Sequence, residues 1–324
     1  MSARATAVYP ESPAARDRWV LARRGLRRRL DPRSAVDGLV EREPNEEGRP
    51  EPVATVFLAN RECPWRCLMC DLWKNTLEEG VPGGSIAEQI RGALAGLPPA
   101  RRIKLYNSGS FFDPRAIPPE DHGEIAAVVG GFDRVIVESH PALVGDACLR
   151  FRDLVSGRLE VAMGLETIHP EVLPLLNKRM TLDQFEEAAA FLGREGIALR
   201  AFVLLGLPFL SPDESLRWAR RSVEFAFERG ATAVSIIPTR PGNGALDELQ
   251  RRGEFQPPTL AALETALAEG IALDRGRVFA DLWNLGEFRH CPSCFEERRQ
   301  RLSAINLLQA VVPSVSCRVC EGQG

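Results

Sequence analysis

Lysine is scarce in this chain, and long apolar runs are missing. Only three of its 41 basic residues are lysine, so arginine carries almost all of the positive charge. No run of about twenty apolar residues occurs, which argues against a membrane-spanning helix. The N-terminus lacks the apolar core of a secretory signal. With 44% hydrophobic residues and a formal net charge of −3, we expect an ordinary globular protein in the cytoplasm.

Disulfide bonds are not expected either, although the chain has eight cysteines. Seven of them fall into three groups, at positions 63, 67 and 70, at 291 and 294, and at 317 and 320. In a reducing compartment such groups bind metal more often than they form disulfides. Cys148 stands alone and is predicted to be a small buried hydrophobe.

The first group has the spacing C-x3-C-x2-C and directly follows Val53–Ala59, an apolar segment that is typical of a buried strand. Three thiolates on one short loop suit an iron–sulfur cluster. A cubane cluster normally has four protein ligands, so three would leave one iron open to another molecule. The alternative is a zinc site that takes its fourth ligand from elsewhere, because structural zinc is closed by four Cys or His.

From residue 52 onward, apolar strands alternate with amphipathic helices, the pattern of parallel βαβ units. The predicted strands are Val53–Ala59, Arg102–Tyr106, Arg134–Glu138, Leu159–Leu165, Ile197–Leu205 and Thr232–Ile237. The predicted helices lie near 84–96, 119–130, 142–155, 181–195, 212–229 and 259–270. Six such units predict an α/β fold, an open (βα)6 partial TIM barrel over residues 52–275. Residues 1–51 would be a basic helix and a linker, and residues 276–324 a metal-binding extension.

The three-cysteine loop resembles the signature of the radical S-adenosylmethionine (SAM) enzymes, whose barrels are of this open type. Four further segments are similar to the Elongator-like branch of that family, which includes the radical subunit of archaeosine synthase: Asn107–Phe111, Gly164–Thr167, Asn177–Lys178 and Gly253–Pro258. The likeness covers roughly residues 50–320. Met69 departs from it, since the family usually has an aromatic residue there. The loop 239–244 and the segment before Cys291 match poorly.

The resemblance implies a [4Fe-4S] cluster held by Cys63, Cys67 and Cys70, with SAM bound at its open iron. It implies reductive cleavage of SAM to a 5′-deoxyadenosyl radical, which abstracts hydrogen from a substrate. The electron would come from a reductant such as flavodoxin or ferredoxin. The likeness to archaeosine synthase implies a tRNA base as substrate and a transglycosylase-like protein as partner. A small metabolite or a peptide is the alternative substrate.

Candidate site residues follow from the rule that chemistry collects at the carboxyl ends of the strands in a parallel barrel. The residues that the resemblance places around SAM are Met69, Ser108, Gly109, Ser110, Glu166, Arg200, Gly206, Pro208 and Ile237. Arg200 would reach the SAM carboxylate if its side chain points inward. Glu166 is favoured because a charged residue that ends an apolar strand needs a partner. Candidates for a base or hydrogen donor are Glu138, His140 and Lys178.

A second metal site is predicted near the C-terminus. Cys291, Cys294, Cys317 and Cys320 form two C-x2-C pairs separated by 22 residues, and four thiolates close a tetrahedral zinc site. The spacer, residues 296–312, has the apolar spacing of a helix. An auxiliary iron–sulfur cluster is the alternative. His290 adjoins this site and is unnecessary as a ligand when four cysteines are present.

The N-terminal segment is basic. Residues 1–33 hold nine Arg against three acidic residues, and Arg16–Arg33 is predicted to be a helix. Such a helix is one form of nucleic-acid-binding surface, although the arginine bias of the whole chain explains it equally well. The acidic remainder of the chain disfavours RNA, because phosphate contacts need a positive surface. A function of another class is a nucleic-acid-binding protein with two zinc sites and no catalysis.

Overall fold

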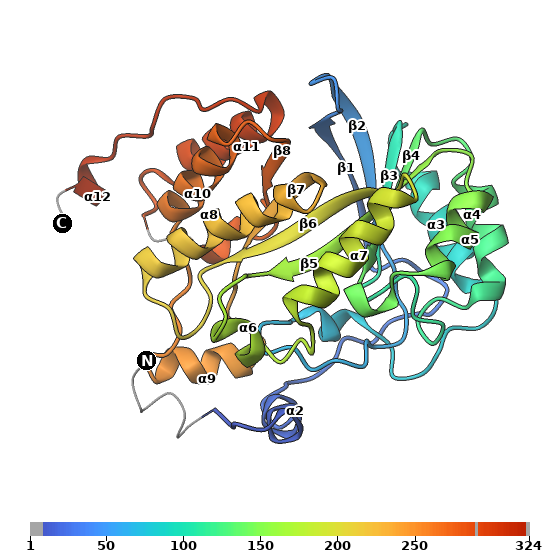
Figure 1. Ribbon diagram of the computed structural model, residues 1–324, viewed down its shortest axis with the longest axis horizontal. Helices are drawn as coiled ribbons and strands as arrows, with labels where there is room; N and C mark the ends of the chain where they lie inside the picture. The colour runs from blue at the N-terminus through green and yellow to red at the C-terminus, as the bar shows by residue number, and fades with distance from the viewer. Residues whose placement is uncertain (1–8, 289–290, 322–324) are drawn as a thin grey trace.

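Eight strands form a single sheet in the order β1 to β8 in the computed structural model, which describes residues 9–288 and 291–321 (Figure 1). Strand β1 (Asp37–Pro44) runs antiparallel to β2 (Pro50–Phe57), and every later pair is parallel. The later strands are β3 (Arg102–Tyr106), β4 (Arg134–Ser139), β5 (Arg158–Glu166), β6 (Ala198–Leu205), β7 (Ala231–Pro238) and β8 (Arg277–Ala280). Strands β1 and β8 are the two edges, so the barrel is open.

Helices cover the outer face of this sheet. They are α3 (Ser85–Gly96), α4 (His122–Val128), α5 (Asp146–Leu154), α7 (Leu182–Arg194), α8 (Pro212–Glu228), α10 (Leu260–Ala272) and α11 (Phe295–Leu308). Figure 1 shows α3, α4 and α5 on one flank and α8, α10 and α11 on the other. Capping boxes at Thr181 and Ser211 begin α7 and α8, as their sequences favour. None of the described helices has the length and apolar character needed to cross a membrane.

Successive side chains of each strand face opposite sides of the sheet. On β3, for example, Ile103 and Leu105 belong to the hydrophobic core beneath the helices. Arg102, Lys104 and Tyr106 alternate with them and therefore face the barrel interior. The same alternation on the other strands gives the interior its own set of side chains.

Buried ion pairs close the amino-terminal half of the interior. Arg200 on β6 donates to Glu160 on β5 (2.8 Å) and to Glu43 on β1 (3.0 Å). Lys104 on β3 pairs with Glu43 as well, so that four strands meet in one charged layer. Burial alone would raise the pKa of Glu43, but Arg200 and Lys104 lower it below the usual value. These four charges satisfy one another.

Residues 34–51 are not the predicted linker. They form β1 and a hairpin turn, in which the Asn45 side chain accepts hydrogen bonds from the backbone of Glu47 and Arg49 (both 2.9 Å). The acidic residues favoured a loop in the sequence, but Glu41 and Glu43 are strand residues that pair with Lys104.

Two further elements differ from the predictions. The N-terminal helix, α2 (Pro13–Leu21), ends well before Arg33. A seventh parallel strand, β8, follows the six predicted ones, so the sheet extends beyond residue 275 and also before residue 52. The fold class is confirmed: an open α/β barrel with a four-cysteine segment at its C-terminal end. Cys148 is fully buried in the core, as predicted.

Candidate functional site

The three-cysteine loop lies at the carboxyl edge of the barrel, between the end of β2 and a short 3-10 helix, Leu72–Asn75. Side-chain amides hold it from two sides. Asn177 donates to Arg66 O (2.8 Å), and Asn243 donates to Leu68 O (2.8 Å). A backbone bond from Leu68 N to Leu176 O (2.8 Å) adds a third attachment. The loop is therefore fixed to the segments that follow β5 and β7.

The three thiols of this loop are half-buried and close enough to influence one another. Burial raises the pKa of each, to about 12 for Cys70, and the neighbouring thiols raise the pKa of Cys67 further. In a cubane cluster each of the three sulfurs would bind a different iron.

Gly109 lets the loop after β3 approach the three-cysteine loop closely. A Cβ at this position would lie 3.2 Å from Cys63 Cβ, a tight contact. Positive charge is also near, since Arg66 and Lys178 lower the pKa of Cys63 relative to burial alone. Three thiols with nearby cations fit a negatively charged metal–thiolate group.

The loop after β3 is anchored by a carboxylate. Glu138 on β4 accepts the backbone N–H of Asn107 (3.0 Å) and those of Ser108 and Gly109. Burial raises the pKa of Glu138 to about 7, although these hydrogen bonds oppose the rise. Ser108 has a left-handed backbone (φ 54°), and Ser110 Oγ lies 3.1 Å from Ser139 Oγ. Glu138 therefore shapes the segment that the sequence placed against SAM.

Glu166 and Lys178 form a buried ion pair at the same edge. Glu166 ends β5 with a left-handed backbone (φ 64°) at a register shift of the sheet. Gly164 makes the pair possible, because a Cβ there would overlap Lys178 Nζ and Glu166 Oε1. The sequence predicted the carboxylate of Glu166 at this edge, and the structure adds its partner.

His140 stacks on Trp65 of the three-cysteine loop, with ring centroids 3.8 Å apart. Its Nδ1 accepts the N–H of Ala142 (3.1 Å), which leaves Nε2 to donate to Lys178 O (3.1 Å). Burial lowers the pKa of His140 to about 3. Both nitrogens are occupied by backbone, so His140 supports the loop and is not placed to transfer a proton.

An apolar wall lies beyond the loop. Met69 and Ile237 are partly buried against a cluster formed by Val172, Leu176, Leu204 and Leu207. Gly206 has a left-handed backbone (φ 79°), and a Cβ there would overlap Pro258. Its N–H donates to Ser215 Oγ (2.6 Å), and Pro208, two residues later, is buried. Gly206 and Pro208 thus shape the end of β6, while Met69 and Ile237 offer apolar surface.

Arg200 is not at this edge. Its guanidinium is 1% exposed and is used by Glu43 and Glu160 in the charged layer at the amino-terminal half of the barrel. The side chain does point inward, as the SAM-binding prediction required. It lies in the charged layer, however, and not at the carboxyl edge where SAM would bind. The structure does not bring it together with the other predicted SAM residues.

Aromatic side chains line the interior between these two layers. Phe57 contacts Trp283 (ring centroids 4.2 Å apart) and Tyr106 (6.3 Å), and Tyr106 contacts Phe202 (6.0 Å). Phe57, Tyr106 and Phe202 are half-buried, and Trp283 is 38% exposed, whereas most strand residues are fully buried. This aromatic row, Phe57, Tyr106, Phe202 and Trp283, is therefore surface that another molecule can contact. The sequence alone does not reveal this row, because single aromatic residues in strands resemble core residues.

The C-terminal cysteines come together as predicted. The four sulfurs of Cys291, Cys294, Cys317 and Cys320 all lie within 4.8 Å of one another, and two pairs are separated by 3.7 Å. A tetrahedral ion with metal–sulfur bonds of about 2.3 Å requires sulfurs about 3.8 Å apart. The spacing therefore fits a single ion. His290 lies outside the described residues.

The arginines of the N-terminal segment mostly bind the protein itself. Arg24 and Arg27 both pair with Glu62 (2.6 Å each), the residue before Cys63, and Arg16 donates to Pro174 O (2.7 Å). In Figure 1, α2 lies beside α9 (Ala245–Arg251) and the short α6 (Val172–Leu175). Part of the predicted nucleic-acid surface is thus used in internal contacts, while four other arginines of the segment remain exposed: Arg18, Arg28, Arg29 and Arg33.

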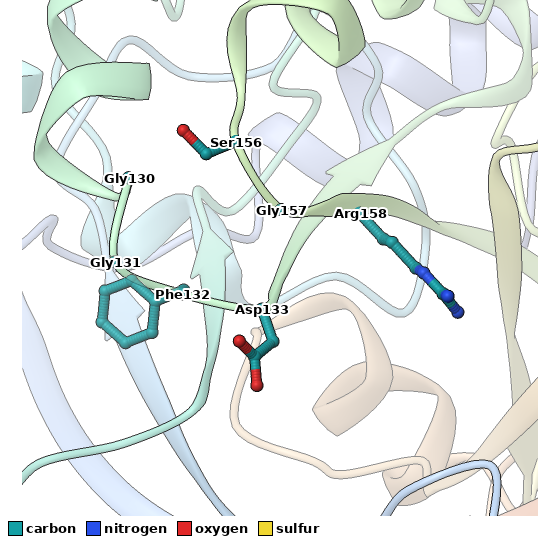
Figure 2. Close-up of a pocket in the computed structure, with 7 residues that line it drawn as sticks. All are labelled: Gly130, Gly131, Phe132, Asp133, Ser156, Gly157 and Arg158. Carbon is teal, nitrogen blue, oxygen red and sulfur yellow. The ribbon is translucent and has the colours of Figure 1, made fainter.

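A pocket of about 400 Å³ lies at the amino ends of the strands, where the turns before β4 and β5 meet (Figure 2). Its lining includes Gly130, Asp133, Gly157 and Arg158. None of the predicted site residues lines it. The pocket lies at the amino ends of the strands, whereas the thiols lie at their carboxyl ends. We do not assign the chemistry to it.

No protein-family model matches the chain. It is 29% identical over 203 residues to archaeosine synthase subunit beta of Thermococcus kodakarensis, covering 60% of this chain and 62% of that one. It is 27% identical over 274 residues to the subunit of the same name from Methanosarcina acetivorans, covering 79% and 78%. An uncharacterized protein of Methanocaldococcus jannaschii is 24% identical over 286 residues, 81% and 78% of the two chains.

Two solved structures share the fold. Elp3 of Methanocaldococcus infernus aligns with a TM-score of 0.51 at 15% identity, over 68% of this chain and 59% of that one. Methylornithine synthase aligns with a TM-score of 0.52 at 14% identity, over 85% and 73%. The chain is thus similar in sequence to the archaeosine synthase beta subunits and shares its barrel fold with Elp3 and methylornithine synthase, in agreement with the radical SAM resemblance that the three-cysteine loop indicated.

Proposed function

We propose that this protein is a radical SAM enzyme, with a [4Fe-4S] cluster on Cys63, Cys67 and Cys70 and SAM at the same edge of the barrel. One observation carries the proposal: three thiols share one loop at the carboxyl edge of the barrel, Asn177 and Asn243 hold this loop, and Gly109 approaches it closely. When bound, cluster and SAM supply a 5′-deoxyadenosyl radical by reductive cleavage of the sulfonium.

The chain's own residues bind and orient SAM in this proposal. The loop Ser108–Ser110, which Glu138 holds in place, faces Cys63 and offers backbone and hydroxyl groups to the methionine end. The ion pair of Glu166 and Lys178 offers polar groups at the end of β5. Met69 and Ile237 provide apolar surface suited to a flat ring such as adenine. Arg200 has no part in this set.

The substrate would enter the interior beside the aromatic row. Phe57, Tyr106, Phe202 and Trp283 offer partly accessible rings, while the charges beneath them are already paired. Such a surface favours a planar, uncharged group, as in a nucleobase, and keeps water from a radical. This and the two relatives named archaeosine synthase subunit beta support a modified tRNA base as substrate.

A small metabolite or peptide is the second candidate. It is favoured by the N-terminal arginines, because Arg16, Arg24 and Arg27 are bound to the protein and leave less positive surface for RNA phosphates. We expect a transglycosylase-like partner to supply the tRNA contacts if RNA is the substrate. A gel shift with bulk tRNA at low salt tests this chain alone, and binding that weakens with salt would support direct RNA recognition.

The decisive experiment is anaerobic reconstitution with iron and sulfide, followed by reduction with dithionite in the presence of SAM. We expect conversion of SAM to 5′-deoxyadenosine, and flavodoxin or ferredoxin as the physiological reductant. Cys67→Ala should abolish the conversion, whereas Cys148→Ala, a core cysteine, should retain it. SAM cleavage by Cys67→Ala at the wild-type rate would refute the cluster assignment, and two zinc ions with no iron would favour the non-catalytic alternative.

The C-terminal cysteines are proposed to hold zinc. The 3.7 Å sulfur separations suit one tetrahedral ion and leave no position open for chemistry. Metal analysis of protein purified without oxygen should find one zinc per chain in both wild type and Cys67→Ala. Iron that persists in Cys67→Ala would indicate an auxiliary cluster at this site.

A further inference from the structure

Three charged side chains connect the four-cysteine site to the barrel. Glu264 lies on α10 and is buried, and Arg298 and Arg301 lie on α11. Arg298 Nε donates to Cys294 Sγ (3.3 Å), and its Nη1 pairs with Glu264. Arg301 approaches the other oxygen of the same carboxylate (3.4 Å). One buried carboxylate thus holds two arginines, and one of them reaches a thiol of the site.

Arg301 extends this connection to the second pair of cysteines. Its Nε donates to Pro313 O (2.8 Å) and its Nη2 donates to Val312 O (3.0 Å). These carbonyls belong to the segment that leads from α11 to Cys317. The contacts therefore run from the first pair of cysteines, through Glu264, to the chain that positions the second pair.

The positive charge of Arg298 is suited to stabilise metal-bound thiolates. Four thiolates around a divalent ion leave a net charge of about −2 at the site, so a cation that donates to a sulfur stabilises the metal-bound state. Glu264 fixes the guanidinium of Arg298 in the orientation that the sulfur needs. If the salt bridge between Arg298 and Glu264 served only to pack α11 on α10, the hydrogen bond from Arg298 to the Cys294 sulfur would not be needed.

We propose that Glu264, Arg298 and Arg301 are an outer shell that retains the metal of the four-cysteine site and couples it to α10. Arg298 neutralises the Cys294 thiolate, and Glu264 and Arg301 position Arg298 and the segment before Cys317. The inference rests on the proposed metal site, and it is independent of SAM chemistry. Metal binding and the packing of α11 on the barrel are then coupled, because Leu302 and Ile305 of α11 belong to the main core.

The test is metal retention by Arg298→Met, with Arg299→Met as matched control. Arg299 is the next residue, is half exposed and pairs with Glu296 on the surface. Zn²⁺ release to a colorimetric chelator should show about 10- to 100-fold weaker binding for Arg298→Met and no change for Arg299→Met. Arg298→Lys, which keeps the charge, should recover part of the loss. Equal zinc affinity of Arg298→Met and Arg299→Met would overturn the proposal.

A spectroscopic readout separates this role from simple packing. With Co²⁺ in place of Zn²⁺, the thiolate-to-cobalt band should shift in Arg298→Met, because the sulfur loses its hydrogen-bond donor, and should stay unchanged in Arg299→Met. An unshifted band together with a lower melting temperature would mean that Arg298 only packs α11, which contradicts the proposal. SAM cleavage is measured on the same samples, so failure of the proposed enzyme activity is recognised separately.

Discussion

At the scale of single residues, Gly164 has the most specific role. It allows Lys178 and Glu166 to meet at the carboxyl end of β5, where any Cβ would overlap both charged groups. The sequence pointed to Glu166 as a strand-ending charge but not to its partner, because Lys178 is twelve residues later and after a separate helix. Spacing along the chain cannot reveal that a loop folds back to bring a cation to a carboxylate.

Gly164→Ala should therefore disrupt the ion pair. Lys178 Nζ and Glu166 Oε1 are the ends of flexible side chains and can move aside, so we expect SAM binding to weaken by about two- to tenfold, which corresponds to about 0.4–1.4 kcal/mol. Equilibrium dialysis with SAM and reconstituted protein measures it. The matched control is Gly193→Ala on α7, where a Cβ meets nothing within 4 Å and a helical alanine is stabilising by about 0.5–1 kcal/mol. Unchanged SAM affinity in Gly164→Ala would remove the pair from the site.

His140 gives a prediction about pH. Burial lowers its pKa from 6.5 to about 3, so the unfolded chain binds more protons than the folded one between these values. The folded state is therefore favoured above pH 6.5 and loses stability as the pH falls, by up to about 1.4 kcal/mol per pH unit from this group. Urea unfolding at pH 7.5, 6 and 5 should show a shallower pH dependence for His140→Gln than for wild type. Parallel curves for the two proteins would contradict the assignment.

At the scale of elements, the alternation of strands and helices was largely predictable, and the loops that build the site were not. The six predicted strands and six predicted helices are present because hydrophobic periodicity and caps such as Thr181 are local signals. Strand β1 was missed because Glu41 and Glu43 are balanced by Lys104, which is sixty residues away in sequence. A charge pattern is ambiguous until its partner is known.

The N-terminal segment shows the same limit and leads to a prediction. Its arginines indicated nucleic acid, yet Arg24 and Arg27 bind Glu62 beside Cys63, and Arg66 binds it too (3.1 Å). Burial would raise the pKa of Glu62, but hydrogen bonds from Arg24 and Arg27 lower it. Glu62→Ala should release the loop, so that iron per chain after reconstitution falls at least about twofold and stability drops by about 1–3 kcal/mol.

The control for this prediction is Glu88→Ala. Glu88 also pairs with an N-terminal arginine, Arg33 (2.7 Å), but both side chains are largely exposed and the pair is far from the thiols in sequence. Such surface pairs contribute little, so iron content and stability should match wild type. If Glu62→Ala takes up as much iron as Glu88→Ala, the N-terminal segment has no part in holding the three-cysteine loop.

At the scale of the whole molecule, the barrel interior is divided into layers. Paired charges fill the amino-terminal half, the aromatic row lies above them, and the thiols, Glu138, Glu166 and Lys178 lie at the carboxyl edge. The layers explain how an open barrel remains stable with accessible surface inside: the ion pairs join β1, β3, β5 and β6 across the interior. Chemistry and stability are thus carried by different ends of the same strands.

A variant of Arg200 tests whether this residue stabilises the fold or binds SAM. If it bound the SAM carboxylate, Arg200→Met would weaken SAM binding and leave the fold intact. Because its guanidinium joins Glu43 and Glu160, we expect instead that the variant loses about 3–5 kcal/mol of unfolding free energy in urea while its folded fraction binds SAM normally. The double variant Arg200→Met with Glu160→Leu should regain part of that stability, because it removes the buried Glu160 charge that has lost Arg200, while Arg134, the other partner of Glu160 (3.2 Å), keeps its pair with Glu46 (2.8 Å). A double variant no more stable than Arg200→Met would mean that Arg200 acts outside this charged layer.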